Sequence, residues 1–182
     1  MKQIKYIHPD AVSSGEIRAI RKKLNLTQEA FAEFVCVSKK TVERWESGKE
    51  NVTGPIVTLI GLLGEYPEFE RKMRVPEKTF PLRLWYMFQN QVCTVIDVDE
   101  RMRRVKIYNF TRDLLKRAFG KEEEPSYERY EAFLESRCFP AGRDKMKLQL
   151  EHLGLPFYDP ILIIEKTQGR VAEDFFWVRI ER

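Results

Sequence analysis

The sequence predicts an α+β chain with an all-α N-terminal domain of four to five helices and a C-terminal domain that combines a small antiparallel sheet with several helices. Apolar residues recur at helical spacing up to about residue 73, whereas residues 82–110 are rich in β-branched and aromatic side chains. Three prolines and many charges separate these stretches. We therefore expect domains at residues 1–74 and 82–182, joined by a linker at residues 75–81.

The N-terminal domain carries start and stop signals for each helix. Thr27 and Ser38 are side chains that cap helix N-termini, and Gly48 can take the left-handed conformation of a C′ residue. Pro55 fits the first turn of a helix. The expected helices run from Gly15 to Lys23, from Thr27 to the turn, from Ser38 to Gly48, from Gly54 to Gly64, and as a tail to Met73. The segment Phe34-Val-Cys-Val is expected to form the turn between the two short helices.

The two short helices in the middle separate apolar from polar side chains. The set expected to face inward is Leu26, Phe31, Ala32, Val35, Val37, Val42 and Trp45. The set expected to face outward from the second of these helices is Lys39, Lys40, Thr41, Glu43, Arg44 and Ser47. This pattern is typical of a helix-turn-helix, in which one helix crosses the DNA backbone and the next enters the major groove.

The polar positions of this unit are candidate DNA ligands. Lys39, Lys40 and Arg44 can donate to guanine O6 and N7, so we expect them to contact bases. Gln28 begins the first short helix, where its side-chain amide and its backbone N–H are expected to bind a phosphate. Lys49 would reach the flanking backbone, and Glu46 is interpreted as a surface residue that can pair with Lys49.

The segment LTQEAFAEFVCVSKKTVERWESGK resembles the Cro/repressor (XRE) helix-turn-helix family, over about Gly15 to Glu65. The resemblance implies base contacts from Lys39, Lys40 and Arg44, and phosphate contacts from Gln28, Ser38 and Thr41. Cys36 departs from the family pattern, which usually has glycine in the turn. A left-handed backbone at Cys36 would therefore be mildly strained.

The flanking residues resemble a narrower group. Tyr6-Ile-His-Pro, Gly54-Pro-Ile-Val and Tyr66-Pro-Glu are similar to the DNA-binding half of antitoxin-type autoregulators, particularly the MqsA-like group, whose zinc-binding domain we do not find here. The resemblance implies a homodimer on a palindromic operator in double-stranded DNA. A dimer is also expected because one small domain buries too little surface for tight specific binding. Leu62 and its neighbours are the candidate dimer surface.

The C-terminal domain is expected to begin with a meander of strands. The expected strands are Leu82–Phe88, Gln91–Val98 and Arg103–Phe110, with Asp99-Glu100-Arg101 as the second hairpin turn. Asp97, Asp99 and Glu100 are close together, and we expect turn chemistry rather than catalysis to explain them. The expected helices are Thr111 to Phe119, Ser126 to Cys138, Arg143 to Leu153, and one from Asp159 or Pro160 to Gly169. The tail AEDFFWVRIER can form a final strand.

The sequence indicates the role of the C-terminal domain less clearly than that of the N-terminal domain. It loosely resembles a segment that precedes the kinase domain of HipA-type toxins, at Arg137, Pro140, Arg143, Gly169, Asp174 and Trp177. We find no kinase motif, so the resemblance implies only a toxin–antitoxin setting. The large side chains at Leu84–Phe88 and Phe175–Trp177 either mark a partner surface or pack on both faces of the sheet.

Four cations of this domain allow two interpretations. Arg137, Arg143, Lys145 and Arg170 either form an anion pocket or pair with Glu135, Asp144, Glu173 and Asp174, and we favour pairing. Cys36, Cys93 and Cys138 lack metal-ligand spacing and are expected to be core thiols. We expect no metal, no cofactor and no catalytic pair, since His152 has only apolar or helical neighbours. No secretory signal or apolar run is evident, which favours a cytoplasmic protein that does not enter a membrane.

Three functions follow from these observations. The leading one is a DNA-binding transcriptional regulator, an antitoxin-like repressor of its own operon, whose C-terminal domain binds a toxin or other partner protein. The second is a one-component regulator whose C-terminal domain senses a small ligand. The third is an enzyme tethered to DNA.

Overall fold

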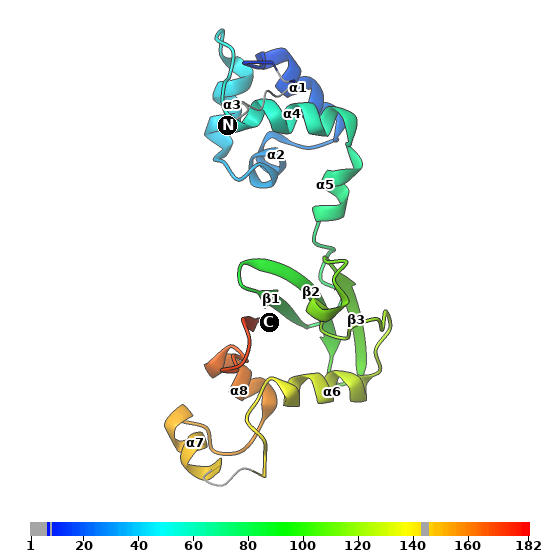
Figure 1. Cartoon of the computed structure of the whole chain (residues 1–182), viewed down its shortest axis with the longest axis vertical. Helices are drawn as coiled ribbons and strands as arrows, with labels where there is room; N and C mark the ends of the chain where they lie inside the picture. Colours follow the sequence, from blue (N-terminus) through cyan, green and yellow to red (C-terminus); the bar gives the residue numbers. More distant parts are fainter. Residues whose placement is uncertain (1–6, 8, 143–145) are drawn as a thin grey trace, which may run out of the picture. The chain divides into compact units, whose positions relative to one another are not determined.

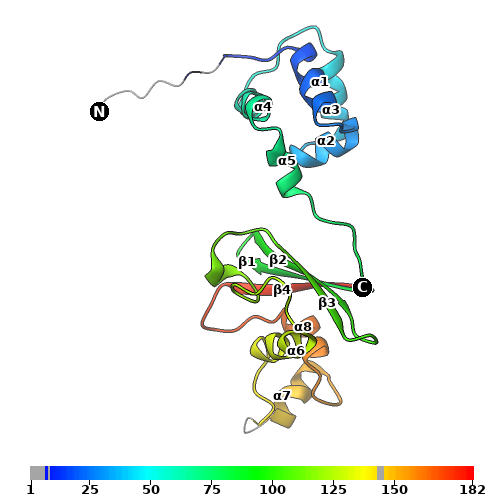
Figure 2. The ribbon, with the colours of Figure 1, turned by 90° about the vertical axis from the view of Figure 1, so that its right-hand side faces the viewer.

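The chain forms an all-helical unit followed by a unit built on a sheet (Figures 1 and 2). The computed structural model describes residues 7, 9–142 and 146–182, and the chain divides into two compact units between Val75 and Pro76. The α+β fold class predicted from the sequence is confirmed. No helix in the described part of the chain is long and apolar enough to cross a membrane. Tyr6, His8, Arg143, Asp144 and Lys145, which the sequence analysis singled out, lie outside the described residues.

Five helices make up the N-terminal unit within its described residues, 7 and 9–75. They are α1 (Ser14–Lys23), α2 (Gln28–Phe34), α3 (Lys39–Ser47), α4 (Pro55–Glu65) and α5 (Glu68–Met73). Both predicted N-caps are confirmed: Thr27 Oγ1 accepts the Ala30 N–H at 3.1 Å, and Ser38 Oγ accepts the Thr41 N–H at 3.1 Å. Each cap satisfies one backbone donor that the helix cannot satisfy itself.

The turn between α2 and α3 is a Schellman motif. The Cys36 N–H donates to Glu33 O at 3.1 Å, and the Val37 N–H donates to Ala32 O at 2.9 Å. Cys36 has φ +56°, a left-handed conformation for which glycine is the usual residue. The strained backbone expected at Cys36 is therefore present. Its thiol is exposed, so the expectation that Cys36 is a core residue is wrong, because the turn that holds it lies at the surface.

Gly48 ends α3, but the left-handed conformation expected of it is wrong. Its φ and ψ are −67° and 151°, which is extended backbone, and its N–H donates to Arg44 O at 2.9 Å. A Cβ at position 48 would lie 2.9 Å from that same oxygen. Gly48 is therefore required by the close approach of two backbone segments.

The N-terminal core forms where α1 to α4 meet. Ile17, Phe31 and Val42 are fully buried and come from three different helices. The other buried members are Val12, Leu24, Ala32, Ile56, Val57, Ile60 and Leu63. A short bridge between Val12 and Val52 closes the unit. The core thus holds α2 and α3 at a fixed angle, which is what a helix-turn-helix requires.

The C-terminal unit is built on one antiparallel sheet in the order β3-β2-β1-β4. The strands are β1 (Leu82–Phe88), β2 (Gln91–Asp99), β3 (Arg104–Asn109) and β4 (Phe176–Glu181). The predicted final strand is confirmed, and it pairs with β1. The predicted second hairpin turn is shifted: residues 100–103 form the turn, because Asp99 still pairs with Arg104 and its carboxylate accepts the Met102 N–H at 3.0 Å.

Two helices cover one face of the sheet (Figure 2). They are α6 (Tyr127–Ser136) and α8 (Pro160–Thr167), and α7 (Met146–Leu153) lies between them in the chain. Tyr130, Phe133 and Ile164 pack on Leu84 and Tyr86 of β1 to form the second core. Because Leu84 and Tyr86 face this core while Trp85 alternates to the other face, the large residues of β1 are divided between both faces.

The predicted helix from Thr111 to Phe119 is wrong. The segment has only a 3₁₀ turn at Leu114–Lys116. The Thr111 hydroxyl accepts the Asp113 N–H at 3.1 Å, and the Asp113 carboxylate accepts the Leu115 N–H at 3.0 Å. These local side-chain bonds compete with the helical pattern, and the segment then attaches to the sheet through the bond from Ala118 N–H to Thr94 Oγ1.

Candidate DNA interface

The outward face of α3 carries the predicted base-contacting cations. Lys39, Lys40 and Arg44 are all exposed, whereas Val42 between them is fully buried against the core. The Lys39 ammonium lies 3.8 Å from the Glu29 carboxylate, and both side chains are more than half exposed. An exposed pair of this kind contributes little, so Lys39 is available to a polyanion.

The remaining predicted contacts flank these cations. Ser38 and Thr41 stand in the first turn of α3, with their hydroxyls 2.8 Å apart. Lys49 is exposed just beyond the C-terminus of α3. The structure therefore brings Ser38, Lys39, Lys40, Thr41, Arg44 and Lys49 together on α3 and its ends. Their contacts with DNA remain predictions.

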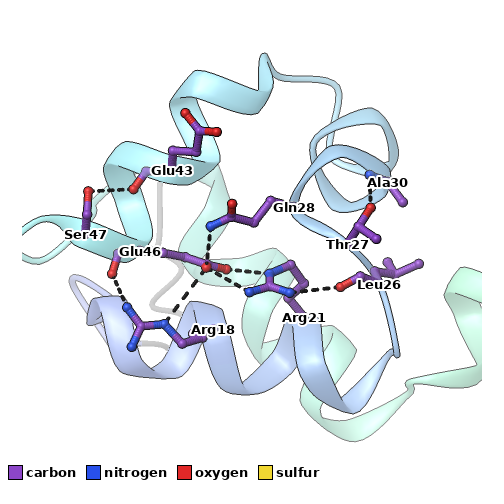
Figure 3. Close-up of polar contacts among 9 residues, drawn as sticks. All are labelled: Arg18, Arg21, Leu26, Thr27, Gln28, Ala30, Glu43, Glu46 and Ser47. Atoms are coloured by element: carbon purple, nitrogen blue, oxygen red, sulfur yellow. Dashed lines mark hydrogen bonds and ion pairs between the residues drawn. The ribbon is translucent and has the colours of Figure 1, made fainter.

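Glu46 lies at the centre of a polar cluster that joins α1, α2 and α3 (Figure 3). Arg21 donates to it through two parallel bonds, Nε to Oε1 at 2.6 Å and Nη2 to Oε2 at 2.9 Å. Arg18 donates to the Glu46 carbonyl oxygen, and Arg21 Nη1 donates to Leu26 O at 2.9 Å. The bidentate geometry fixes the orientation of α3 on α1.

The interpretation of Glu46 as a surface residue paired with Lys49 is therefore wrong. Only 4% of Glu46 is exposed, because it stands four residues after Val42 on the inward face of α3. That spacing was the available signal, since a carboxylate on an apolar face needs a cationic partner. The hydrogen bonds from Arg21 lower the pKa of Glu46 below its ordinary value and keep it charged.

Gln28 is placed differently from the expectation. Its side-chain Nε2 donates to Glu46 Oε2 at 2.8 Å, so the amide nitrogen is engaged inside the unit. Gln28 is the first residue of α2, where the backbone N–H has no acceptor within the helix. The side-chain amide nitrogen is therefore not free for a phosphate, and the phosphate contact of the backbone N–H stays a prediction.

Of the four C-terminal cations, Arg137 forms an ion pair, whereas Arg143 and Lys145 lie outside the described residues. Arg137 donates to Asp174 through Nη1 at 2.7 Å and Nη2 at 3.0 Å, and its Nε donates to Gly169 O at 3.0 Å. The preferred expectation of pairing is confirmed for Arg137. Arg170 lies over the ring of Trp177 at 5.2 Å.

Asp97 does not belong to the hairpin turn. It is fully buried in β2 and accepts Arg83 Nε at 2.6 Å and Arg83 Nη2 at 2.8 Å across the strands. The expectation of turn chemistry at Asp97 is therefore wrong, because its side chain completes a buried ion pair. Within the described ranges, no three His, Cys, Asp or Glu side chains lie close enough together to hold a metal ion.

Comparisons with known proteins agree with this geometry. Residues 17–60 match the sequence model of the helix-turn-helix family. Antitoxin HigA-2 of Vibrio cholerae serotype O1 is 37% identical over 57 residues, which are 31% of this chain and 55% of that protein. The chain thus spans about half the length of this relative. The N-terminal unit therefore contains a helix-turn-helix domain over residues 17–60.

Proposed function

We propose that the chain is a sequence-specific DNA-binding regulator that represses its own operon as a cytoplasmic, antitoxin-like protein without catalytic activity. The observation that carries the proposal is the exposed cationic face of α3, which the buried Glu46 cluster holds in a fixed orientation. The similarity to an antitoxin over the same region favours the antitoxin role. The narrower resemblances to MqsA-like and HipA-type proteins remain predictions, and the proposal does not depend on them.

Recognition of DNA would combine contacts to base edges in the major groove with contacts to backbone phosphates. Lys39, Lys40 and Arg44 would donate to base edges, because all three are exposed on α3 and two of them begin it. The hydroxyls of Ser38 and Thr41, the backbone N–H of Gln28 and the ammonium of Lys49 would bind phosphates. Phosphate contacts set the register of the protein on the duplex and the base contacts read its sequence.

A homodimer fits an apolar stripe on the N-terminal unit. Leu62, Tyr66, Phe69 and Met73 are each more than half exposed, and they follow one another at spacings of four, three and four residues along α4 and α5. Phe69 and Met73, four residues apart on α5, share one helical face, whereas Leu62 lies on α4 and Tyr66 at the junction of the two helices. Exposed apolar side chains that form a continuous patch mark contact surfaces, so we assign this α4–α5 stripe to the dimer.

The C-terminal unit would bind the partner protein, which in an antitoxin is a toxin. This role needs no reacting groups, only a rigid surface. The buried pairs Arg83–Asp97 and Arg137–Asp174 supply that rigidity, because each ties separate segments together through two parallel hydrogen bonds.

Binding to the promoter of its own gene tests the proposed function. A mobility-shift titration with that duplex should show specific binding that a scrambled duplex does not compete away. The affinity should fall steeply between 50 and 200 mM salt, by about a thousandfold for six or more phosphate contacts. Equal affinity for both duplexes would contradict a sequence-specific regulator.

A ligand sensor is the second candidate, because the C-terminal unit has a cavity of about 840 Å³. Apolar Leu153, Ile163 and Val171 line it beside Gln149, whose buried Oε1 has no hydrogen-bond partner among the described residues. This size fits a small molecule. A metabolite that raises the melting temperature of the wild type but not of Leu153→Trp, which fills the cavity, would favour this function.

A further inference from the structure

The sheet face opposite α6 and α8 carries side chains in ordered rows. One row crosses all four strands with alternating charge and consists of Lys106, Asp97, Arg83 and Glu181. The next row along the strands consists of Tyr108, Val95, Trp85 and Arg179. Beyond it, Met87 stands opposite Trp177. Side chains two residues apart in a strand share a face, so both rows and this pair lie on the same side.

The linker already covers the charged row. Thr79 N–H donates to Asp97 Oδ2 at 2.7 Å, and Lys78 Nζ donates to Glu181 O at 3.1 Å. The charges of this row compensate one another through the Arg83–Asp97 pair, whose side chains are almost entirely buried. This end of the face therefore binds an extended chain segment, and its two cations and two carboxylates balance in net charge.

The aromatic row next to it presents rigid, half-buried rings. Trp85 Nε1 donates to Glu181 Oε2 at 2.9 Å, and Trp177 Nε1 donates to Gln89 O at 2.7 Å. Each indole is held by its own hydrogen bond, so a partner would not have to order it on binding. Trp, Tyr, Met and Arg are the residue types enriched at the energetic centres of protein interfaces.

Arg179 gives this row an uncompensated positive charge. Its guanidinium lies over the Trp85 ring at 4.4 Å, and no carboxylate of the described residues pairs with it. A partner that covers this row must therefore supply an anionic group opposite Arg179, since burying an unpaired guanidinium is costly. Around that group its surface must be apolar, to match Trp85, Tyr108 and Met87.

We propose that this aromatic row, with Trp177 and Met87, is the surface on which the C-terminal unit binds its partner protein, through an apolar patch that carries an aspartate or glutamate for Arg179. The inference rests on the proposed function, in which this unit binds a partner. It continues the surface that already binds the linker segment Lys78–Phe80.

A single-stranded nucleic acid fits this face less well than a protein. Stacking platforms for nucleic acid combine aromatic rings with a groove of strong positive potential. From Pro76 to Arg182 the chain has 19 Lys and Arg against 18 Asp and Glu, a net charge of +1. On the face itself, Asp97 and Glu181 alternate with the cations, so it lacks the continuous positive groove that a polyanion needs, whereas one carboxylate satisfies Arg179.

Co-expression of the full chain with each protein encoded beside its gene tests the inference. Arg179→Glu should weaken binding to the partner at least tenfold, because it places two carboxylates against each other. Arg179→Lys should keep most of the affinity. Lys166→Glu is the matched control, since Lys166 is equally exposed but lies on α8, against the other face. The wild type and these three variants should all have the same melting temperature and the same affinity for the operator.

The possible outcomes separate this inference from the proposed function. A partner that binds the wild type, Arg179→Glu and Lys166→Glu equally would overturn the assignment of this surface to partner binding. It would leave the proposed function intact. If the wild type binds no neighbouring protein, the partner role and this surface both fall, while the operator assay decides the regulator role independently. Tight binding of single-stranded oligothymidine that Arg179→Glu abolishes would assign the face to nucleic acid and overturn the inference.

Discussion

Arg21 of α1 binds Glu46 of α3 through two parallel hydrogen bonds of 2.6 and 2.9 Å. Gln28 of α2 donates a third bond to the same carboxylate at 2.8 Å. One buried carboxylate thus connects the three helices that define the DNA-binding geometry. Because Lys39, Lys40 and Arg44 are exposed on the same helix, the angle at which they would meet DNA depends on this connection.

Replacing Glu46 should strongly destabilise the N-terminal unit. Glu46→Gln leaves the Arg21 guanidinium without its counter-charge in a site where only 14% of the Arg21 side chain is exposed. We expect a loss of about 3 kcal/mol in the free energy of unfolding, measured by urea denaturation at pH 7. Glu43→Gln, on the exposed side of the same helix, should change it by no more than about 0.5 kcal/mol. Equal effects of the two substitutions would show that the cluster does not stabilise the fold.

Lowering the pH should remove the contribution of the Glu46 carboxylate to the free energy of unfolding. The pKa of Glu46 is lowered in the folded state, chiefly by the hydrogen bonds from Arg21. A carboxyl group with a lowered pKa stabilises the fold above its ordinary value of 4.5, and this contribution disappears as the pH falls through the folded pKa. The stability difference between the wild type and Glu46→Gln should therefore narrow when urea denaturation is repeated from pH 7 down to pH 3. A difference that stays constant would rule out this linkage.

Glycine at position 36 should stabilise the protein. Cys36 holds a left-handed conformation with φ +56° in the Schellman motif, which costs a residue with a Cβ about 1 kcal/mol. Cys36→Gly should raise the free energy of unfolding by about that amount. Cys36→Ala retains the Cβ but removes the thiol, so it should give no gain. A gain from alanine as large as that from glycine would attribute the effect to the thiol.

Charges in the α4–α5 stripe should dissociate the proposed dimer. Leu62→Glu and Phe69→Glu place carboxylates in a surface that the dimer would bury, so each should shift the molar mass in light scattering towards the monomer. Ala19→Glu is the control, because Ala19 is exposed on α1 and is not part of the stripe. A wild-type chain that is monomeric on its operator would contradict the dimer.

The sequence predicts those features that depend on neighbouring residues. Thr27, Ser38, Ser126 and Asp159 each cap the helix that follows, as their residue type indicates. Strand β1 also has the predicted bounds, because its composition and the turns beside it are local signals.

Features that depend on distant partners were missed. The environment of Glu46 is set by Arg21, which is 25 residues away, so its burial could not be deduced from Lys49 nearby. Asp97 looked like a turn residue because Arg83 faces it only across the strands. The segment Thr111–Phe119 has helix-forming residues, yet bonds from Asp113 and to Thr94 give it another conformation.

Operator binding by a variant without the three α3 cations tests the central claim most directly. Lys39→Ala, Lys40→Ala and Arg44→Ala should together abolish specific binding to the promoter of the chain's own gene and leave the melting temperature unchanged, because all three side chains are exposed. A variant with Lys72, Lys147 and Lys166 replaced by Ala removes the same charge from other exposed positions and should bind almost as the wild type does. Unchanged operator affinity in the α3 variant would contradict the assignment of this helix to DNA.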